Sequence, residues 1–365
     1  MDYNSFRRKS RKFKIGNVGI GGSYPISIQS MANTDTHDME ATYRQAKELE
    51  AAGCDIFRLA INDIEAARTI TFLKDRGIKM PLVADIHFDY KIALAALEAG
   101  VDKVRINPGN IGDRKRVEAV VDACRKRKTP IRIGVNSGSV EGNLLKKYGR
   151  VTADALAESA MGHAKILDEL EFYDYAISVK ASSVPMMIEA NRRLASLTDA
   201  PIHLGVTEAG ARTRAVVKSS IGIGALLSEG IGDTVRVSLT DDPVEEIAAA
   251  REILSALNLT EKRGMDIVSC PTCGRTKIAL INMLSDFETK AREAGILNMN
   301  IKVALMGCAV NGPGEAREAD IGIAGGVGEG LLFKKGEIVR KIKEDCLVDE
   351  LIREIKMMEN EVNGG

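Results

Sequence analysis

The chain has 365 residues, of which 45% are hydrophobic and 28% charged, which is typical of a globular protein with a sizeable core. Lysine plus arginine balance aspartate plus glutamate at 51 each, and aromatic residues make up 4% of the chain with no tryptophan. This charge balance argues against a general nucleic-acid or anionic-membrane binder, and the scarcity of aromatic rings argues against base stacking.

The N-terminal segment carries a basic run with no apolar stretch behind it. We therefore expect neither a signal peptide nor a transmembrane helix, and we expect a cytoplasmic location. In that compartment the six cysteines stay reduced unless they bind a metal or take part in catalysis.

A unit of one short β-rich run followed by an amphipathic helical segment recurs from residue 25 to about residue 257. Several of the helical segments end at a glycine suited to the left-handed conformation, namely Gly53, Gly77 and Gly100. The eight β-rich runs begin at Pro25, Cys54, Pro81, Val101, Pro130, Tyr173, Pro201 and Asp233. Eight βα units predict a (β/α)8 TIM barrel over residues 1–258. They favour it over an open doubly wound sheet, because no G-x-G-x-x-G follows the first strand.

Two glycine-rich segments flank this pattern. IGNVGIGG precedes the first strand and predicts a hairpin that plugs the barrel floor. A change of composition at residues 258–266 marks a boundary, and residues 265–365 predict a small α+β domain. Within it, GIAGGVGEG at residues 322–330 runs into a strand rather than a helix N-terminus, so we interpret it as turns and not as a phosphate loop.

Charged side chains recur at the predicted carboxyl ends of the barrel strands, where TIM-barrel enzymes have their active sites. Arg105, Arg132 and Arg236 lie in V-R-I, I-R-I and V-R-V frames, so they point into the barrel if their neighbours face the helices. With Arg58 and Lys180 they would repel one another unless an anion lay among them. Because arginine binds phosphate bidentately, we predict a multiply charged phosphate ligand, with a diphosphate favoured. The alternative is that each arginine pairs with a local acid in a structural network.

Other polar residues lie at the same strand ends. Asp85, His87 and Glu208 are candidates for proton transfer, with a structurally hydrogen-bonded histidine as the alternative for His87. The remaining strand-end candidates are Asn107, Asn136 and Ser238.

Three cysteines of the second domain have a spacing that suits a metal. Cys270 and Cys273 form a C-x-x-C pair, and Cys308 follows at the end of an apolar strand. A zinc ribbon would need a second close pair of cysteines, which the sequence lacks. For the C-x-x-C pair taken alone, a structural zinc site and a redox-active cysteine pair are both open alternatives. A [4Fe–4S] cluster takes four ligands, and the fourth is either Cys346 or Glu315, which follows an Asn-Gly-Pro-Gly turn. A displaceable carboxylate would leave one iron open to substrate and would indicate a catalytic cluster.

Over nearly its whole length the chain resembles the 4-hydroxy-3-methylbut-2-enyl diphosphate synthase family of the non-mevalonate isoprenoid pathway. The motifs that carry the resemblance are IGNVGIGG, PISIQSMANTDT, ADIHFDY, VRINPGNIG, SCPTCGR and MGCAVNGPGEAREADIGIAGG. The chain lacks the long plant-type insertion, as most bacterial members do. The resemblance implies an iron-sulfur oxidoreductase that converts 2-C-methyl-D-erythritol 2,4-cyclodiphosphate to the linear allylic diphosphate by two-electron reductive ring opening and loss of water.

The resemblance also implies roles for the candidate residues. The [4Fe–4S] cluster would be held by Cys270, Cys273, Cys308 and Glu315, with Asn311 near it and the substrate. Asp85, His87, Glu208 and Glu315 would line the reacting end, with Glu208 as a proton source. The diphosphate would be held by Arg58, Arg105, Asn107, Arg132, Asn136, Lys180, Arg236 and Ser238.

The resemblance implies ferredoxin or flavodoxin as electron donor, which the sequence alone does not distinguish. A cluster of cations near the C-terminus would suit an acidic donor, although a solvated face is the more ordinary interpretation of such a run: Lys334, Lys335, Arg340, Lys341 and Lys343.

We also expect a homodimer whose active sites are shared between chains. The last barrel helix opens with Asp242 as N-cap and Pro243 at its first position, and it carries the chain away from the barrel mouth. The second domain is therefore tethered far from the mouth of its own barrel.

Two alternatives from other classes stay open. One is a non-redox phosphate-binding TIM-barrel enzyme of the pterin-synthase type with a zinc-stabilised tail. The other is a non-catalytic, zinc-stabilised scaffold that binds anions.

Overall fold

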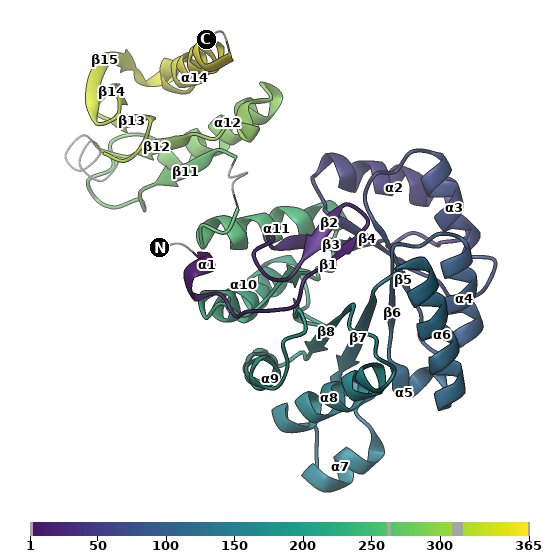
Figure 1. Ribbon diagram of the computed structural model, residues 1–365. Coiled ribbons are helices and arrows are strands. Elements are labelled where there is room, and N and C mark those ends of the chain that lie inside the picture. The colour runs from purple at the N-terminus through teal and green to yellow at the C-terminus, as the bar shows by residue number, and fades with distance from the viewer. Residues whose placement is uncertain (1–2, 261–263, 309–316, 364–365) are drawn as a thin grey trace. The chain divides into compact units, whose positions relative to one another are not determined.

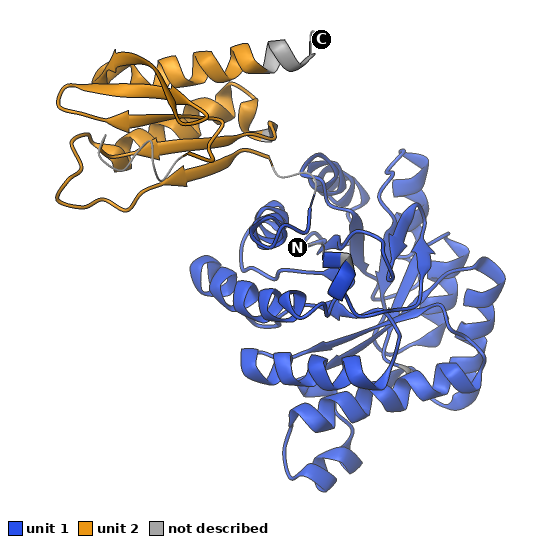
Figure 2. Ribbon diagram, turned by 60° about the vertical axis from the view of Figure 1, so that its left-hand side comes forward, with its two compact units in different colours: residues 1–260 blue, residues 261–365 orange. Residues whose placement is uncertain are grey.

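The structure, a computed structural model, describes residues 3–260, 264–308 and 317–363 of the chain. It divides into two compact units, residues 1–260 and residues 261–365, each with its own hydrophobic core (Figure 2). Within the described residues, no helix is long and apolar enough to cross a membrane.

The first unit is a TIM barrel, as the sequence predicted. Eight parallel strands follow the order β8-β7-β6-β5-β4-β3-β10-β9, and a bridge between Ile177 and Ile202 joins the two ends of the sheet. All eight predicted runs contain a strand, although β9 and β10 have only two residues each. The strands are β3 (Ser27–Met31), β4 (Ile56–Ala60), β5 (Leu82–Asp85), β6 (Lys103–Ile106), β7 (Ile131–Asn136), β8 (Tyr175–Lys180), β9 (His203–Leu204) and β10 (Thr234–Val235).

Helices surround the barrel, and the main core lies between them and the outward-facing side chains of the strands (Figure 1). The predicted helix ends are confirmed at Gly53, Gly77 and Gly100, whose φ angles are 77°, 80° and 87°. The helices of this unit are α1 (Tyr3–Phe6), α2 (Met39–Ala51), α3 (Arg68–Asp75), α4 (Tyr90–Glu98), α5 (Pro108–Ile111), α6 (Arg114–Arg127), α7 (Gly142–Tyr148), α8 (Ala153–Glu169), α9 (Val184–Leu197), α10 (Arg212–Ser228) and α11 (Pro243–Ala256), with a 3-10 turn η1 (Ser137–Ser139).

The predicted floor hairpin is present as the antiparallel pair β1 (Phe13–Ile15) and β2 (Val18–Ile20). Its buried side chains form a cluster with residues from the N-terminal halves of β4, β5 and β8. The members of this cluster are Phe13, Ile15, Ile20, Ile56, Val83 and Ala176. Apolar side chains therefore close the barrel at the end opposite the mouth.

The second unit is a five-stranded sheet in the order β11-β12-β13-β14-β15, parallel from β11 to β13 and antiparallel from there. The main core of the unit joins α12 and α14, which contact each other, to the sheet. The elements are β11 (Asp266–Ser269), α12 (Leu280–Glu293), η2 (Ile296–Asn298), β12 (Lys302–Met306), β13 (Ile321–Gly325), β14 (Glu329–Lys334), β15 (Glu337–Lys343), η3 (Glu344–Cys346) and α14 (Leu347–Asn363).

The interpretation of residues 322–330 as turns is wrong for the first half of that segment. β13 is the buried central strand of the sheet, and the turn is confined to the residues before β14. A Cβ atom on Gly322 would lie 2.5 Å from both the Ala304 carbonyl oxygen and the Phe333 Cζ atom. The glycine is therefore required by the close approach of neighbouring chain segments within a strand, and not by a turn.

Candidate active site

Asp85, at the end of β5, is held between two arginines at the barrel mouth. Its Oδ2 lies 2.5 Å from Arg58 Nη2, and its Oδ1 lies 3.1 Å from Arg105 Nη1. Burial by itself raises the pKa of Asp85, but Arg58, His87 and Arg105 outweigh burial and hold that pKa well below its ordinary value. Asp85 is thus a buried carboxylate that orients two guanidinium groups at the mouth.

A glycine in the neighbouring strand makes room for one of these guanidinium groups. A Cβ atom on Gly134 in β7 would lie 2.3 Å from Arg105 Nε and 2.8 Å from its Cζ. The carbonyl oxygen of Gly134 accepts a hydrogen bond of 3.4 Å from Arg105 Nη2. Gly205 has the same relation to Lys180, whose Nζ would lie 2.9 Å from an added Cβ. A glycine within β7 and another directly after β9 therefore give these two cations their space inside the barrel.

Arg132 is fully buried in β7, with 1% of its surface exposed. Its Nη1 donates to Ser178 Oγ at 2.9 Å, while Nε and Nη2 are buried and have no partner in the structure. Buried guanidinium nitrogens normally have acceptors, so these donors are available to an anionic ligand.

Lys180 and Arg236 complete the set of cations that the sequence predicted for the mouth. Lys180 is buried and forms no ion pair within the described residues. Burial and then its arginine neighbours, Arg236 and Arg132 first among them, hold the pKa of Lys180 well below its ordinary value. Arg236 Nη2 lies 3.3 Å from Glu246 Oε1.

Glu246 is a residue of this site that the sequence analysis missed. It lies in the first turn of α11, where an acid is expected on general grounds, yet its side chain is buried. It accepts hydrogen bonds from Ser30 Oγ at 2.8 Å and from the Leu239 N–H at 3.2 Å. The sequence offered one indication that Glu246 is buried, namely its position next to Ile247, which lies on the apolar face of the predicted helix.

Positive charge therefore exceeds negative charge at the mouth. Asp85 and Glu246 are the carboxylates paired with the mouth cations in the described chain. The structural network in which each arginine has its own acid does not form, because Arg132 has none and Asp85 serves two arginines. The five cations are Arg58, Arg105, Arg132, Lys180 and Arg236. Against two carboxylates, the four arginines alone leave an excess of two positive charges, and a protonated Lys180 would make it three, which suits a multiply charged anion.

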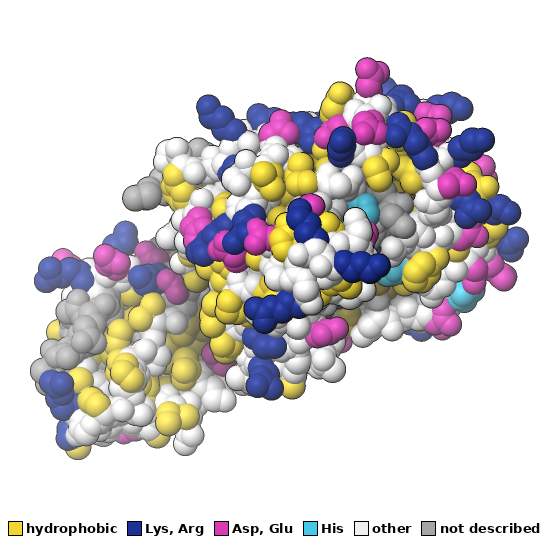
Figure 3. All heavy atoms as spheres, turned by 90° about the horizontal axis from the view of Figure 1, so that it is seen from below, with side chains coloured by type: hydrophobic (Ala, Val, Ile, Leu, Met, Phe, Trp, Pro, Cys, Tyr) yellow, Lys and Arg dark blue, Asp and Glu magenta, His cyan; other side chains and the backbone are white. Residues whose placement is uncertain are grey.

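The face of the outer surface seen in Figure 3 does not show this asymmetry. On the face presented in Figure 3, lysine and arginine side chains are interspersed with aspartate and glutamate. This arrangement matches the balanced composition of 51 basic and 51 acidic residues. The positive excess is thus a property of the barrel interior.

The remaining strand-end candidates surround the same mouth. His87 is exposed, and its Nε2 lies 3.4 Å from Asp85 Oδ2. Glu208 is exposed in the loop after β9, with a φ of 52° that is unusual for a residue other than glycine. Asn107 is buried directly after β6. Asn136, the last residue of β7, and Ser238, which follows β10, are partly buried.

In the second unit, the C-x-x-C segment lies beside the end of β12. The Gly307 N–H donates to Cys270 Sγ at 3.2 Å, and Cys308 is the next residue. The Lys277 N–H donates to the Gly307 carbonyl oxygen at 2.9 Å. These bonds bring two of the three predicted cysteine ligands to neighbouring positions.

Cys273 is exposed, and its neighbours stabilise the thiolate relative to an isolated thiol. The backbone N–H of Arg275, its guanidinium group and the Thr276 hydroxyl lower the pKa of Cys273. A thiolate is the form that binds metal, and thiolates are the ligands that iron-sulfur clusters use. All three predicted cysteine ligands are described, but the described residues contain no group of three side chains placed to hold a metal ion. The predicted Glu315 and Asn311 lie outside the described residues.

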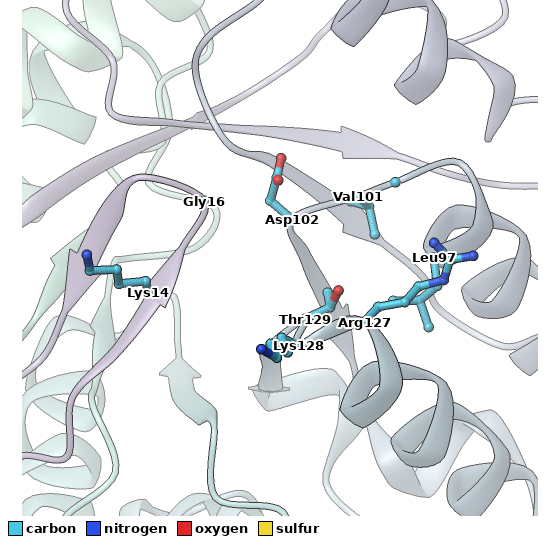
Figure 4. A pocket seen from close by; sticks show the side chains of 9 residues that line it. Lys14, Gly16, Leu97, Val101, Asp102, Arg127, Lys128 and Thr129 are labelled. Carbon is cyan, nitrogen blue, oxygen red and sulfur yellow. The ribbon is translucent and has the colours of Figure 1, made fainter.

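A surface depression of about 340 Å³ lies at the other end of the barrel (Figure 4). The depression is lined by Lys14 and Gly16 of the floor hairpin and by Asp102, Lys128 and Thr129, which precede β6 and β7. Catalytic groups of TIM barrels lie at the carboxyl ends of the strands. This depression is therefore not the candidate active site.

The fold and the mouth define a TIM-barrel protein with a positively charged barrel mouth and an appended cysteine-bearing domain. The family model for the GcpE TIM-barrel domain matches residues 10–251, and that for the GcpE protein C-terminal domain matches residues 266–357. The chain belongs to the GcpE family.

Curated relatives match nearly the whole chain. The chain is 58% identical over 350 residues to a 4-hydroxy-3-methylbut-2-en-1-yl diphosphate synthase (flavodoxin) of Clostridium perfringens, covering 96% of this chain and 99% of the relative. It is 57% identical over 352 residues to the protein of the same name from Ruminiclostridium cellulolyticum, covering 96% and 98%.

A solved structure of the N-acetylneuraminic acid synthetase of Leptospira borgpetersenii also matches, with a TM-score of 0.50 and 14% identity over 78% of this chain and 98% of that chain. At this identity the likeness shows the fold alone.

Proposed function

We propose that the chain is a 4-hydroxy-3-methylbut-2-en-1-yl diphosphate synthase. The observation that carries the proposal is the 58% identity to a relative of that name over 96% of the chain. In the reaction, two electrons and two protons enter 2-C-methyl-D-erythritol 2,4-cyclodiphosphate. The ring carbon–oxygen bond to phosphate breaks, and one hydroxyl leaves as water to give 4-hydroxy-3-methylbut-2-enyl diphosphate.

The barrel mouth would hold the diphosphate part of the substrate. Its excess of two positive charges from the arginines, or three with a protonated Lys180, is close to the charge of a diphosphate. The buried Nε and Nη2 of Arg132 have no partner in the structure and could donate to that anion. Asp85 would fix Arg58 and Arg105 before the ligand arrives, which reduces the ordering that binding requires. Asn107, Asn136 and Ser238 would add neutral hydrogen bonds around the same anion.

Proton transfer would fall to groups at the rim of the mouth. Glu208 is exposed on the loop after β9 and is our candidate for delivering the proton to the leaving hydroxyl. His87 would keep its orientation through its contact of 3.4 Å with Asp85.

The second unit would hold a [4Fe–4S] cluster on Cys270, Cys273, Cys308 and Glu315. When bound, the cluster supplies single electrons and an iron that accepts a substrate oxygen. The hydrogen bond from the Gly307 N–H to Cys270 Sγ would help to orient that sulfur toward the cluster. Reduced thiolate ligands suit a cytoplasmic location, which we propose for the protein.

Flavodoxin is the electron donor that we propose, because the relatives carry that word in their names. The cluster of cations near the C-terminus gives little support to the idea that an acidic flavodoxin docks there. Lys334 pairs with Glu354, Arg340 with Glu350 and Glu354, and Lys341 with Glu329, all at 2.6 to 2.8 Å. The charges of these three cations are thus largely balanced by neighbouring glutamates, as is usual on a solvent-exposed face.

We infer a homodimer in which the second unit of one chain serves the barrel of the other. Helix α11 starts at the mouth and has 14 residues, so it carries the chain about 21 Å toward the floor. Roughly nine residues then precede β11, and fully extended they span about 30 Å. A linker of that length can do little more than return to the level of the mouth of its own barrel, which leaves no length to place the second unit over that mouth. In a two-fold dimer the second unit can instead cap the mouth of the partner's barrel.

Mixed dimers test this inference. Glu208→Gln impairs the barrel and Cys308→Ser impairs the cluster, so neither homodimer should turn over substrate. Random pairing on co-expression makes about half of the dimers mixed, and about a quarter of all sites should then be active. Mixed dimers that form without any recovery of activity would show that each cluster serves its own barrel.

The alternatives predict a different metal. A pterin-synthase-type enzyme or an anion-binding scaffold would have one zinc in the tail, and the names of the relatives do not favour either. Anaerobic purification followed by iron and sulfide analysis separates the cases. We expect a brown protein with about four irons and four sulfides per chain, whereas a colourless protein with zinc would refute the cluster.

A further inference from the structure

Lys103 is a buried lysine inside the barrel that the proposed reaction does not use. It is the first residue of β6, two residues before Arg105, and only 1% of its surface is exposed. Its Nζ has a single, long hydrogen bond of 3.5 Å to Gln29 Oε1. In the described chain it forms no ion pair. It therefore lies one inward-facing layer below the arginines of the mouth.

The groups around Lys103 offer no free negative charge. Gln29 of β3 and His203 of β9 are neutral, and the His203 Nδ1 bonds Thr234 Oγ1 of β10 at 2.8 Å. Asp85 is already shared by two arginines, and the floor hairpin closes the layer below with apolar side chains. The other positively charged groups in this part of the barrel are Arg58 of β4, Arg105 of β6, Arg132 of β7, Lys180 of β8 and Arg236 directly after β10.

A protonated amine is unstable in such surroundings. A buried charge without a counter-ion loses its hydration, and the nearby guanidinium groups repel it. Burial first, then Arg132 and Arg58, hold the pKa of Lys103 well below its ordinary value of 10.5. Several polar atoms around it are also buried without partners, including Gln29 Nε2 and His203 Nε2. The interior is thus short of negative charge as long as the mouth holds no anion.

We propose that Lys103 takes up a proton from solvent when a diphosphate occupies the mouth, so that anion binding and proton uptake in the barrel interior are coupled. A unit negative charge at about 10 Å, with an effective dielectric constant of about 20, favours the protonated amine roughly tenfold, and a diphosphate carries more than one charge. The mouth then gains positive charge only when a ligand is there to balance it. Lys103 is in this sense a positioning residue that acts through its charged neighbours Arg132 and Arg58.

The identity of the anion rests on the proposed function, but the coupling is a property of the barrel. Inorganic diphosphate is therefore the first probe, because its binding needs neither a cluster nor turnover. Calorimetric titration in buffers of different ionisation enthalpy gives the number of protons taken up per diphosphate bound. Proton exchange by the ligand itself is common to all variants and cancels in the comparison.

The decisive comparison is wild type against Lys103→Met. The matched control is Lys14→Met, because Lys14 belongs to the floor hairpin and is exposed. We expect proton uptake to fall by up to one proton in Lys103→Met and to stay unchanged in Lys14→Met. Between the pKa that Lys103 has in the complex and its lower pKa in the free protein, the affinity of wild type for diphosphate should rise relative to that of Lys103→Met, by up to about tenfold for each unit by which pH falls. If Lys103→Met does not fold, Lys103→Gln replaces it in the comparison, because the glutamine amide can still donate a hydrogen bond to Gln29. Equal proton uptake in wild type and a folded Lys103 variant would overturn the proposal.

Diphosphate binding that fails in wild type and every variant would count against both the coupling and the anion site. If diphosphate binds with the expected proton change and the cyclodiphosphate is not turned over, the coupling holds and only the proposed function fails.

Discussion

Gly134→Ala is a substitution of one methyl group that should disable the anion site. The added Cβ would lie 2.3 Å from Arg105 Nε and 2.6 Å from its Nη2. Arg105 has little freedom to move aside, because its side chain is buried and Asp85 binds it at 3.1 Å. We expect the guanidinium group to be pushed away from Asp85 and out of line with the ligand.

The expected loss follows from the contact that Arg105 would make with the diphosphate. One charge-assisted hydrogen bond contributes about 1.5–3 kcal/mol, which corresponds to roughly 10- to 150-fold weaker binding. Calorimetric titration of the purified variant with the cyclodiphosphate measures this affinity directly. Overpacking also costs about 1–3 kcal/mol of folding stability, so thermal unfolding should be recorded alongside.

Gly138→Ala is the matched control. Gly138 follows in the 3-10 turn η1, and a Cβ there would have no heavy atom within 4 Å. Its affinity should equal that of wild type. A folded Gly134→Ala protein that binds the cyclodiphosphate with wild-type affinity would refute the role assigned to Arg105 and its glycine neighbour.

Three further predictions concern the cysteines, a buried histidine and the central strand of the second unit. Cys273→Ser should lose the brown colour and the iron, whereas Cys346→Ser should keep both; colour lost only in Cys346→Ser would overturn the ligand assignment. Burial holds the pKa of His203 well below 6.5, so the unfolded state binds the extra proton and stability should fall as pH drops below about 6.5, by up to about 1.4 kcal/mol per pH unit. That slope in chemical denaturation should be smaller in His203→Gln, and an equal slope would assign it to other groups. Gly322→Ala should lower the free energy of unfolding of the second unit by about 1–3 kcal/mol, because the methyl meets the Ala304 carbonyl oxygen; calorimetry that shows no change in that unit would contradict this packing.

The barrel was predictable because its sequence repeats one pattern eight times, with Gly53, Gly77 and Gly100 ending helices before strands. The mouth cations were predictable for the same reason. In a frame such as V-R-I, alternation along the strand decides which way the arginine points once the neighbours are known to face the helices.

What the sequence did not reveal depends on contacts between distant segments. Glu246 has the position of an ordinary first-turn acid, and only the fold brings it to Arg236 and Ser30. Gly322 was interpreted as part of a turn, because its close contact with Ala304 and Phe333 comes from pairing across the sheet. Lys103 was passed over for a similar reason, since nothing in its local sequence shows that the surrounding strands bring no acid to it.

The central claim is that this chain reductively opens a cyclic diphosphate at the barrel mouth with electrons from a cluster in the second unit. The most direct test is turnover by the anaerobically purified protein of 2-C-methyl-D-erythritol 2,4-cyclodiphosphate with reduced flavodoxin, followed by mass spectrometry. We predict 4-hydroxy-3-methylbut-2-enyl diphosphate as the product, with two electrons consumed per molecule and no product from Cys308→Ser. A protein that carries its full complement of iron and sulfide, binds the cyclodiphosphate and leaves it unchanged under these conditions would contradict the claim.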